Sequence, residues 1–120
     1  MTIWSPLNAG ILTGKYNEGI PKGSRLDIFK DNGGLKGNID EAGGLNEKTI
    51  GKVRKLTKIA EGLGVKMSQL AIAWVLKNNH VSSAILGVSK IEQLYENLES
   101  VKIKDKLTPD VMKSIEEILR

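Results

Sequence analysis

The sequence predicts an α/β protein in which short parallel strands alternate with longer helices. Two β-favouring runs, residues 2–4 and 82–86, are separated by segments whose apolar residues recur every three or four positions, and strands that alternate with helices form parallel sheets. The second run is continuously apolar near its end, which is typical of a strand buried on both faces. Two short strands cannot cover both faces and both edges of each other. We therefore expect a piece of a larger α/β fold, or a chain that pairs with another.

Composition limits the class of protein. The 120 residues are 40% hydrophobic and 27% charged, with a net charge of +4 and no cysteine, which suits one soluble domain without disulfides, thiolate metal sites or a cysteine nucleophile. No apolar run approaches the roughly 20 residues of a membrane span, and no signal peptide is evident. We expect a cytoplasmic location and no membrane insertion. The lysines are spread among acids and the aromatic residues lie far apart, which argues against binding to nucleic acid.

The first strand is expected over residues 2–4 and to end at Ser5-Pro6, because proline donates no ladder hydrogen bond and restricts the residue before it. Residues 7–15 then turn on two glycines. The polar, glycine-rich stretch from Tyr16 to Asn46 is predicted to be a long surface excursion, and such loops are usually either functional or disordered.

Two helices are expected next. Apolar residues recur with helical spacing from Ile50 to Leu63, with lysines mainly between them, and Gly62 and Gly64 are expected to end this helix. Ser68 is placed to cap the second helix, in which residues 70–76 leave no polar face. We therefore predict that this second helix is covered on nearly all sides.

The second strand is followed by two more predicted helices. Ser89 and Glu92 have the spacing of a capping box at the start of a helix over residues 90–99. The last helix is expected to start at Thr108, with Pro109 in the first helical position. Its buried residues are predicted to be Val111, Ile115, Ile118 and Leu119.

Most motifs that suggest chemistry are weak. The segment from Gly10 to Lys15 fails as a P-loop, because three residues instead of four separate its glycines and Tyr16 replaces the magnesium-binding Ser or Thr. The stretch Gly33–Gly37 lacks the dinucleotide-binding pattern and is interpreted as a flexible loop. His80 has no second histidine to form a metal pair, and a surface turn suits it better than a general base.

The segment Leu86-Gly87-Val88-Ser89 gives a stronger signal, since a strand passes through a glycine into a helix start. Exposed amide groups and the positive end of the helix dipole form a natural anion site there. Ser89 could equally serve only as a helix cap, because every helix has such an end and few bind phosphate. Both interpretations stay open.

Several separated motifs occur in the order typical of one family. They are Trp4-Ser5-Pro6-Leu7 followed by Gly10, then Gly14-Lys15-Tyr16, Ser24-Arg25, and Leu86-Gly87-Val88-Ser89 followed by Gln93, Glu96 and Asn97. In these motifs the chain resembles the aldo-keto reductases. Residues 69–74 and 81–83 look closest to the branch of the voltage-gated potassium channel β subunits. The resemblance covers nearly the whole chain and is weak over residues 29–45.

The resemblance implies a (β/α)8 barrel, of which this chain is the C-terminal part. The chain would correspond to roughly the last third of that barrel, from the seventh strand onward, whereas a whole barrel has about 250 residues or more. Residues 1–45 would form strand 7 and a cofactor-covering loop. Residues 46–120 would form helices, strand 8 and the C-terminal helices.

The resemblance also implies NADP(H) as the cofactor and a first group of binding residues near the first strand. Trp4 would lie beside the nicotinamide. Lys15 would supply a cation to the pyrophosphate. The loop that covers the pyrophosphate would contain Ser5, Pro6, Leu7 and Gly10.

A second group of implied binding residues would hold the adenosine half of the cofactor. Arg25, preceded by Ser24, resembles the arginine that recognises the 2′-phosphate, a task that suits a planar and always charged group. Gly87 and Ser89 resemble the turn whose amides face phosphate. The positions that match contacts to the adenine side are Gln93, Glu96 and Asn97.

The family's hydride chemistry needs a tyrosine acid with lysine, aspartate and histidine around it, all from earlier strands that this sequence lacks. Neither Tyr16 nor Tyr95 matches the tyrosine, so we assign no catalytic residue. We expect the NADP(H)-binding C-terminal portion of a reductase of small aldehydes or ketones. One alternative is a cofactor-sensing regulatory subunit that docks on the cytoplasmic domain of an ion channel. Another is an inactive truncated fragment, which would bind NADPH weakly or not at all, and exposed apolar surface would favour association, including into a homo-oligomer.

Overall fold

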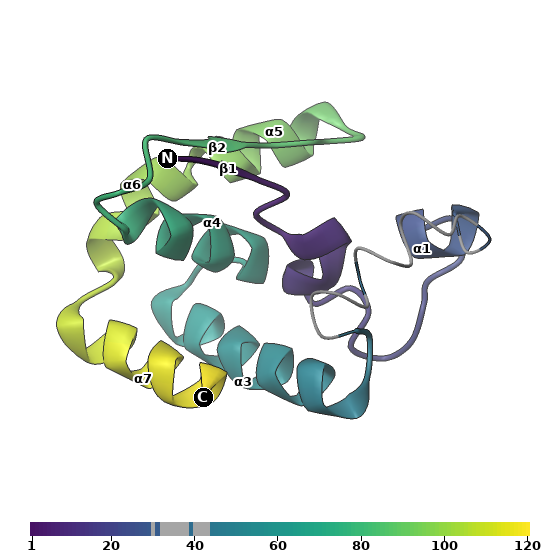
Figure 1. Cartoon of the computed structure of the whole chain (residues 1–120), viewed down its shortest axis with the longest axis horizontal. Helices are drawn as coiled ribbons and strands as arrows, with labels where there is room; N and C mark the ends of the chain where they lie inside the picture. The colour runs from purple at the N-terminus through teal and green to yellow at the C-terminus, as the bar shows by residue number, and fades with distance from the viewer. Residues whose placement is uncertain (30, 32–38, 40–43) are drawn as a thin grey trace.

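Two short parallel strands and a central helix organise the chain (Figure 1). The computed structural model describes residues 1–29, 31, 39 and 44–120; the predicted loop Gly33–Gly37 lies outside these residues. In chain order the elements are β1 (Thr2–Trp4), the 3₁₀ helix η1 (Asn8–Thr13), α1 (Arg25–Ile28), α3 (Glu47–Leu63), α4 (Met67–Lys77), β2 (Ser83–Ile85), α5 (Ile91–Leu98), α6 (Ser100–Ile103), the 3₁₀ helix η2 (Lys104–Lys106) and α7 (Pro109–Leu119).

The two strands pair in parallel, as the alternation of strands and helices predicts. Trp4 is opposite Ile85 in the register, and the amide of Ser82 donates to the carbonyl of Met1 at 2.8 Å. Both strands are left uncovered, as expected of a pair whose further sheet neighbours are not in this sequence: Ile85 is 57% exposed and Trp4 is 70% exposed. Among the described residues each strand has only the other as a partner, so their outer surfaces stay open.

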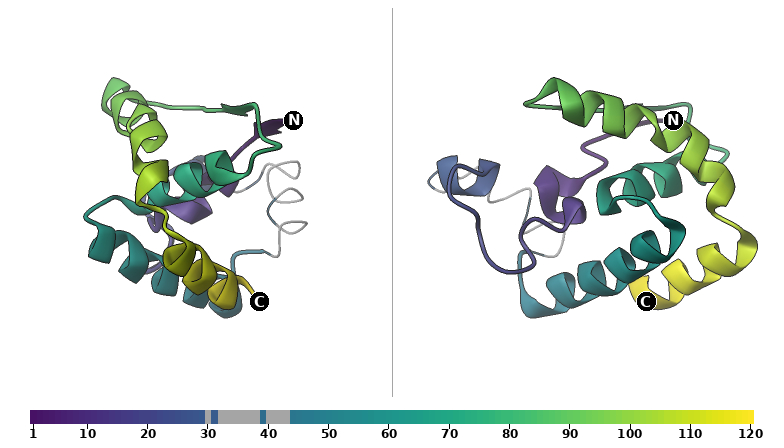
Figure 2. Two further views of the ribbon diagram at one scale, coloured as in Figure 1. Left: turned by 90° about the vertical axis from the view of Figure 1, so that its left-hand side faces the viewer. Right: turned by 180° about the vertical axis from the view of Figure 1, so that it is seen from behind.

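The helix α4 lies between the strand pair and the helices α3 and α7 (Figure 2), and it contacts η1, α3, α5, α6 and β2. Its first half is fully packed, with Leu70, Ile72 and Ala73 almost inaccessible. The prediction that it is covered on nearly all sides is wrong at Trp74, which is 38% exposed. Trp74 is one of the residues that line an apolar groove on the surface.

The ends of α3 and α7 follow the sequence predictions closely. Gly64 ends α3 in a left-handed conformation with φ 69°, whereas Gly62 remains inside the helix. Thr108 caps α7 by accepting a hydrogen bond from the amide of Val111 at 3.4 Å, and Pro109 is its first residue. Ile115 is buried as predicted, but Leu119 is 39% exposed, so its expected burial is wrong.

Two predicted serine caps are wrong. The helix α4 begins at Met67, before Ser68 could cap it, and the amide of Lys66 donates to the side chain of Gln69 at 3.0 Å. The helix α5 begins at Ile91, so Lys90 and not Ser89 occupies the cap position. In both cases the helix is offset relative to the serine, and the box predicted between Ser89 and Glu92 does not form.

The excursion after η1 is anchored where it is described. The ring of Tyr16 is buried, and its hydroxyl oxygen accepts a hydrogen bond from the amide of Leu26 at 3.4 Å. Arg54 on α3 donates to the carbonyl of Asn17 at 2.6 Å. A four-residue helix that the sequence did not predict, α1, forms here and lies to one side of the molecule (Figures 1 and 2).

No single helix in the described part of the chain is long and apolar enough to cross a membrane. α3 and α4 pass that test only when taken together, by length and composition, and a bend of 91° separates them.

Candidate cofactor site

The carboxyl ends of β1 and β2 lie at the same edge of the sheet. Because the strands are parallel and Trp4 pairs with Ile85, the loops that begin at Ser5 and Leu86 leave this edge together. Ligands of parallel α/β sheets bind at the carboxyl ends of the strands. The structure therefore brings together two of the segments that the sequence singled out, one after each strand.

The loop after β1 has an unusual backbone. Ser5, Asn8 and Ala9 have positive φ angles of 50°, 49° and 55°, and Gly10 follows at 99°. The loop is held by hydrogen bonds from the amide of Asn8 to the carbonyl of Ser5 at 2.9 Å and from the amide of Gly10 to the carbonyl of Leu7 at 3.0 Å. Positive φ outside glycine is uncommon and clusters at functional sites. Asn8 and Ala9 are thus further candidates in this loop, which the motifs did not include.

The predicted residues Gly10 and Lys15 are in direct proximity. A Cβ atom at Gly10 would lie 2.6 Å from Cε and 2.9 Å from Nζ of Lys15. The lysine ammonium also lies 5.3 Å from the centroid of the Tyr16 ring, within range of a cation–π interaction. Because Gly10 has no side chain, the end of the Lys15 side chain can lie against the loop at this position.

Pro6 and Leu7 join this loop to the core. Pro6 is buried, and Leu7 packs against the buried cluster that includes Ile11. Trp4, directly before them, remains exposed. The loop therefore has an apolar base and an indole at its entrance, which could provide a surface for an aromatic ligand ring.

Ser24 and Arg25 are not brought to the strand edge. They lie at the start of α1, which is separate from β1, β2 and α5 in both views (Figures 1 and 2). Ser24 caps α1 by accepting from the amide of Asp27 at 3.4 Å. The guanidinium of Arg25 is exposed, so it is accessible to an anion.

The segment after β2 uses its own polar groups internally. Both the amide and the hydroxyl of Ser89 donate to the side-chain oxygen of Gln93, at 3.0 and 3.2 Å. Gly87 is exposed, and a Cβ atom there would meet nothing within 4 Å. A phosphate at this turn would therefore have to compete with Gln93 for the donors of Ser89.

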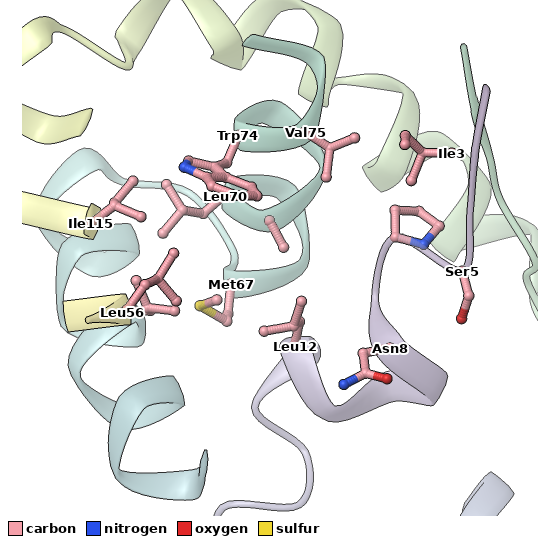
Figure 3. A pocket seen from close by; sticks show the side chains of 13 residues that line it. Ile3, Ser5, Asn8, Leu12, Leu56, Met67, Leu70, Trp74, Val75 and Ile115 are labelled. Atoms are coloured by element: carbon pink, nitrogen blue, oxygen red, sulfur yellow. The ribbon is translucent and has the colours of Figure 1, made fainter. Parts of the chain in front are cut away.

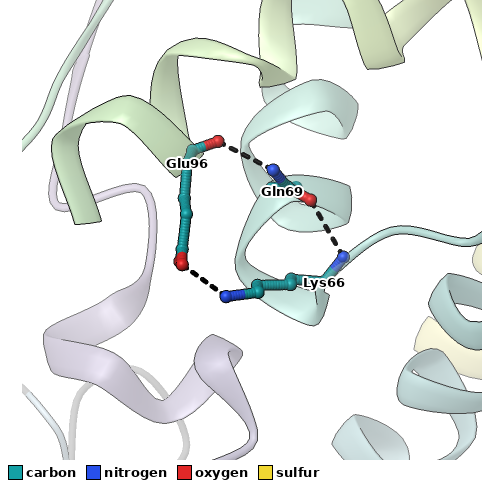
Figure 4. A network of polar contacts seen from close by, with 3 residues as sticks. All are labelled: Lys66, Gln69 and Glu96. Carbon is teal, nitrogen blue, oxygen red and sulfur yellow. Dashed lines mark hydrogen bonds and ion pairs between the residues drawn. The ribbon is translucent and has the colours of Figure 1, made fainter. Parts of the chain in front are cut away.

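The last two predicted positions, Glu96 and Asn97, lie where α5 meets the body of the molecule. Asn97 is buried. The Glu96 carboxylate forms an ion pair with Lys66, and its backbone carbonyl accepts from Gln69 at 2.9 Å (Figure 4). Lys66 and Gln69 were missed at the sequence level, because nothing in their spacing from Glu96 indicates a contact between separate helices.

An apolar groove lies beside the loop after β1, between β1, η1, α3, α4 and α7 (Figure 3). Its volume is about 300 Å³, and only Ser5 and Asn8 contribute polar side chains to it. The principal apolar lining residues are Ile3, Leu12, Leu56, Met67, Leu70, Trp74, Val75 and Ile115. This lining suits apolar cover and not a phosphate group. No group of three His, Cys, Asp or Glu residues suited to hold a metal occurs in the described ranges.

The chain belongs to the aldo/keto reductase family. The family model described as "Aldo/keto reductase family" matches residues 1–120, which confirms the resemblance inferred from the motifs. The chain is 52% identical over 118 residues to a protein of Schizosaccharomyces pombe named "Putative voltage-gated potassium channel subunit beta". That match covers 98% of this chain and 33% of the relative, so the chain spans one third of the length of the curated relative it matches.

Proposed function

We propose that this chain is the NADP(H)-binding C-terminal part of a (β/α)8 barrel, in a protein that reduces aldehydes or ketones by hydride transfer. Residues 1–45 would provide strand 7 and the cofactor-covering loop, and residues 46–120 strand 8 and the surrounding helices. The observation that carries the proposal is the parallel register of Trp4 and Ile85. This register places the loops after both strands at one edge of the sheet. Phosphate sites of such barrels are often built from the loops after strands 7 and 8.

The pyrophosphate would lie along the loop of Ser5, Pro6, Leu7 and Gly10. Lys15 supports this role because its ammonium lies over Gly10 and is exposed to an approaching anion. Trp4 would contact the nicotinamide through its exposed indole. The chemistry that NADP(H) supplies is a hydride for the carbonyl carbon, and this chain's residues would bind and orient it.

The adenosine half would lie toward Gly87, Ser89 and α5. Glu96 and Asn97 follow Gln93 by three and four residues, which places each of them beside Gln93 on the helix. Arg25 with Ser24 would bind the 2′-phosphate, an assignment supported by the family motif and by the exposure of the guanidinium.

This assignment of Arg25 can be tested by cofactor preference in the complete polypeptide that carries these residues. We expect Arg25→Met to weaken NADPH binding by about tenfold or more, since a charge-assisted hydrogen bond contributes about 1.5–3 kcal/mol. Binding of NADH, which lacks the 2′-phosphate, should change little. Fluorescence titration measures both, and Lys22→Met, which removes an exposed cation three residues earlier, is the matched control. Equal losses for the two cofactors, or equal effects of the two variants, would contradict the role.

A second function is favoured by the similarity to the S. pombe protein, whose name gives it as a potassium channel subunit. The complete protein would then be a regulatory subunit that binds the cofactor and docks on the cytoplasmic domain of a voltage-gated potassium channel. Co-purification with such a domain, changed by NADPH, would support it. Turnover of simple aldehydes without any such association would favour the reductase.

The chain by itself would be inactive under this proposal. Its strand pair and groove leave Trp4, Ile85 and Trp74 uncovered, and surfaces of this kind drive association. We expect the isolated 120 residues to bind NADPH weakly or not at all and to self-associate. Co-expression with the remaining two thirds of the S. pombe relative should restore NADPH binding if the groove is a barrel surface. Tight, saturable binding by a monodisperse monomer would refute this expectation.

A further inference from the structure

Three residues form a closed ring of polar contacts between α4 and α5 (Figure 4). The ammonium of Lys66 donates to Oε1 of Glu96. The side-chain amide of Gln69 donates to the backbone carbonyl of Glu96 at 2.9 Å, and its oxygen accepts from the backbone amide of Lys66 at 3.0 Å. Glu96 is therefore held at two points, one on its backbone and one on its carboxylate.

The ring connects the largely buried helix α4 to α5, whose apolar side chains are largely exposed. α4 is the central helix, with Leu70 and Ile72 buried directly after the ring residues. On α5, by contrast, Ile91, Tyr95 and Leu98 are each more than half exposed. Among the described residues, the side-chain hydrogen bonds between α4 and α5 all end on Glu96. The ring therefore supplies the side-chain hydrogen bonds that hold α5 against α4.

We propose that Lys66 and Gln69 are positioning residues of the cofactor site, which hold α5 and direct the Glu96 carboxylate toward the adenine. This inference rests on the proposed function, in which Glu96 faces the adenine side. An ionised carboxylate can only accept hydrogen bonds, and the adenine ring's donor is its 6-amino group. One carboxylate oxygen pairs with Lys66, and the second can accept from the amino group. Lys66 itself would not touch the cofactor.

The expected effect follows from the exposure of the pair. The side chains of Lys66 and Glu96 are 62% and 38% exposed, so the ion pair contributes at most about 1 kcal/mol, which corresponds to about fivefold in affinity. Lys66→Met should therefore weaken NADPH binding by up to about fivefold. Lys66→Arg keeps the charge and a donor, and it should restore most of the affinity.

The experiment compares NADPH with its hypoxanthine analogue, in which a carbonyl replaces the 6-amino group, in the complete polypeptide that carries these residues. The readout is the ratio of the two dissociation constants for the unchanged protein, Lys66→Met and Lys66→Arg. Lys102→Met is the control, because it removes another surface ion pair, with Glu99 at 3.6 Å, that is more exposed and does not link α4 to α5. If Lys66 directs Glu96, Lys66→Met should lower the preference for NADPH over the hypoxanthine analogue by up to about fivefold.

The outcomes distinguish failure of this inference from failure of the proposed function. A reduced preference in Lys66→Met, restored in Lys66→Arg and unchanged in Lys102→Met, supports the inference. Unchanged affinities in Lys66→Met overturn it and leave the proposed function intact. An equal loss for both nucleotides also overturns it, since it would show general support of α5 without direction of Glu96. If the unchanged protein binds neither nucleotide, the proposed function fails and the inference fails with it.

Discussion

The contact between Gly10 and Lys15 can be tested by adding a single methyl group. Gly10 has φ 99° and ψ −2°, and Gly14, in the same segment, has φ 81° and ψ −5°. Alanine at either position therefore incurs a similar backbone strain of about 1–2 kcal/mol. Only their surroundings differ, so Gly14→Ala is a matched control for Gly10→Ala.

The surroundings determine the expected difference. A Cβ at Gly10 would lie 2.6 Å from Cε of Lys15, whereas at Gly14 the nearest atom, Nδ2 of Asn17, is 3.5 Å away in ordinary contact. The end of a lysine side chain can move, so Gly10→Ala should displace it and lose its interaction with Tyr16. Such an exposed cation–π contact contributes about 0.5–1 kcal/mol. The free energy of unfolding should therefore fall by about 1.5–3 kcal/mol for Gly10→Ala and by about 1–2 kcal/mol for Gly14→Ala.

The assay is urea unfolding followed by circular dichroism, with Lys15→Met added to each variant. Lys15→Met should reduce stability by about 0.5–1 kcal/mol beside Gly14→Ala and by much less beside Gly10→Ala, where the contact is already lost. In the complete polypeptide that carries these residues, NADPH affinity should also fall more in Gly10→Ala than in Gly14→Ala, because Lys15 no longer lies along the loop. Equal costs of Lys15→Met in the two backgrounds would refute the placement of the lysine over Gly10.

Two further predictions concern the body of the fold. Leu70→Ala should lower the free energy of unfolding by about 2–5 kcal/mol, because Leu70 is 1% exposed in α4; a loss below about 1 kcal/mol would show that α4 is not central to the core. Thr108→Ala should lower it by about 1 kcal/mol through loss of the α7 cap. Ser114→Ala removes a hydroxyl from the middle of the same helix and should change stability by less than about 0.5 kcal/mol. Similar effects of the two α7 variants in urea unfolding would mean that the cap contributes nothing.

The sequence predicted best those features that depend on a few neighbouring residues. Thr108 and Pro109 start α7 at the expected positions, and Gly64 ends α3. Each of these signals acts over three or four residues through one backbone hydrogen bond or one φ angle. The parallel arrangement of the strands was also predictable, because it follows from the order of elements along the chain.

The predicted serine caps are wrong because a glutamine at the third helical position, not a serine, marks the start of each helix. The glutamines Gln69 and Gln93 are the third residues of α4 and α5. In α4 the glutamine side chain accepts the amide hydrogen bond of the cap residue Lys66, and in α5 it accepts from Ser89, one residue before the cap. A glutamine at the third helical position is half of the capping-box signature. A cap three residues before each glutamine, at Lys66 and at Lys90, corresponds to both observed helix starts.

The residues of the candidate site were proposed from their types and order in the sequence, which do not give the geometry of the loop after β1. A glycine at position 10 is compatible with a positive φ angle, whereas nothing in the residue types of Ser5 and Ala9 indicates their positive φ angles. Such angles persist in non-glycine residues only where surrounding structure enforces them. Here the buried side chains of Pro6 and Ile11 flank and anchor the loop. Tertiary packing, which local sequence does not encode, therefore sets the shape of this loop.

Burial of the exposed strand pair and groove should also affect cofactor affinity. Burying a large apolar side chain contributes about 1.5–3 kcal/mol, so cover of Trp4, Ile85 and Trp74 would add an amount comparable with the 5–15 kcal/mol that stabilises a typical domain. The groove that borders β1 also includes Ser5 and Asn8 of the strained loop. Whatever covers the groove must therefore also restrain the loop that is proposed to hold the pyrophosphate. Cofactor binding and burial of the groove should strengthen each other, because a ligand that favours the ordered loop also favours the covered state.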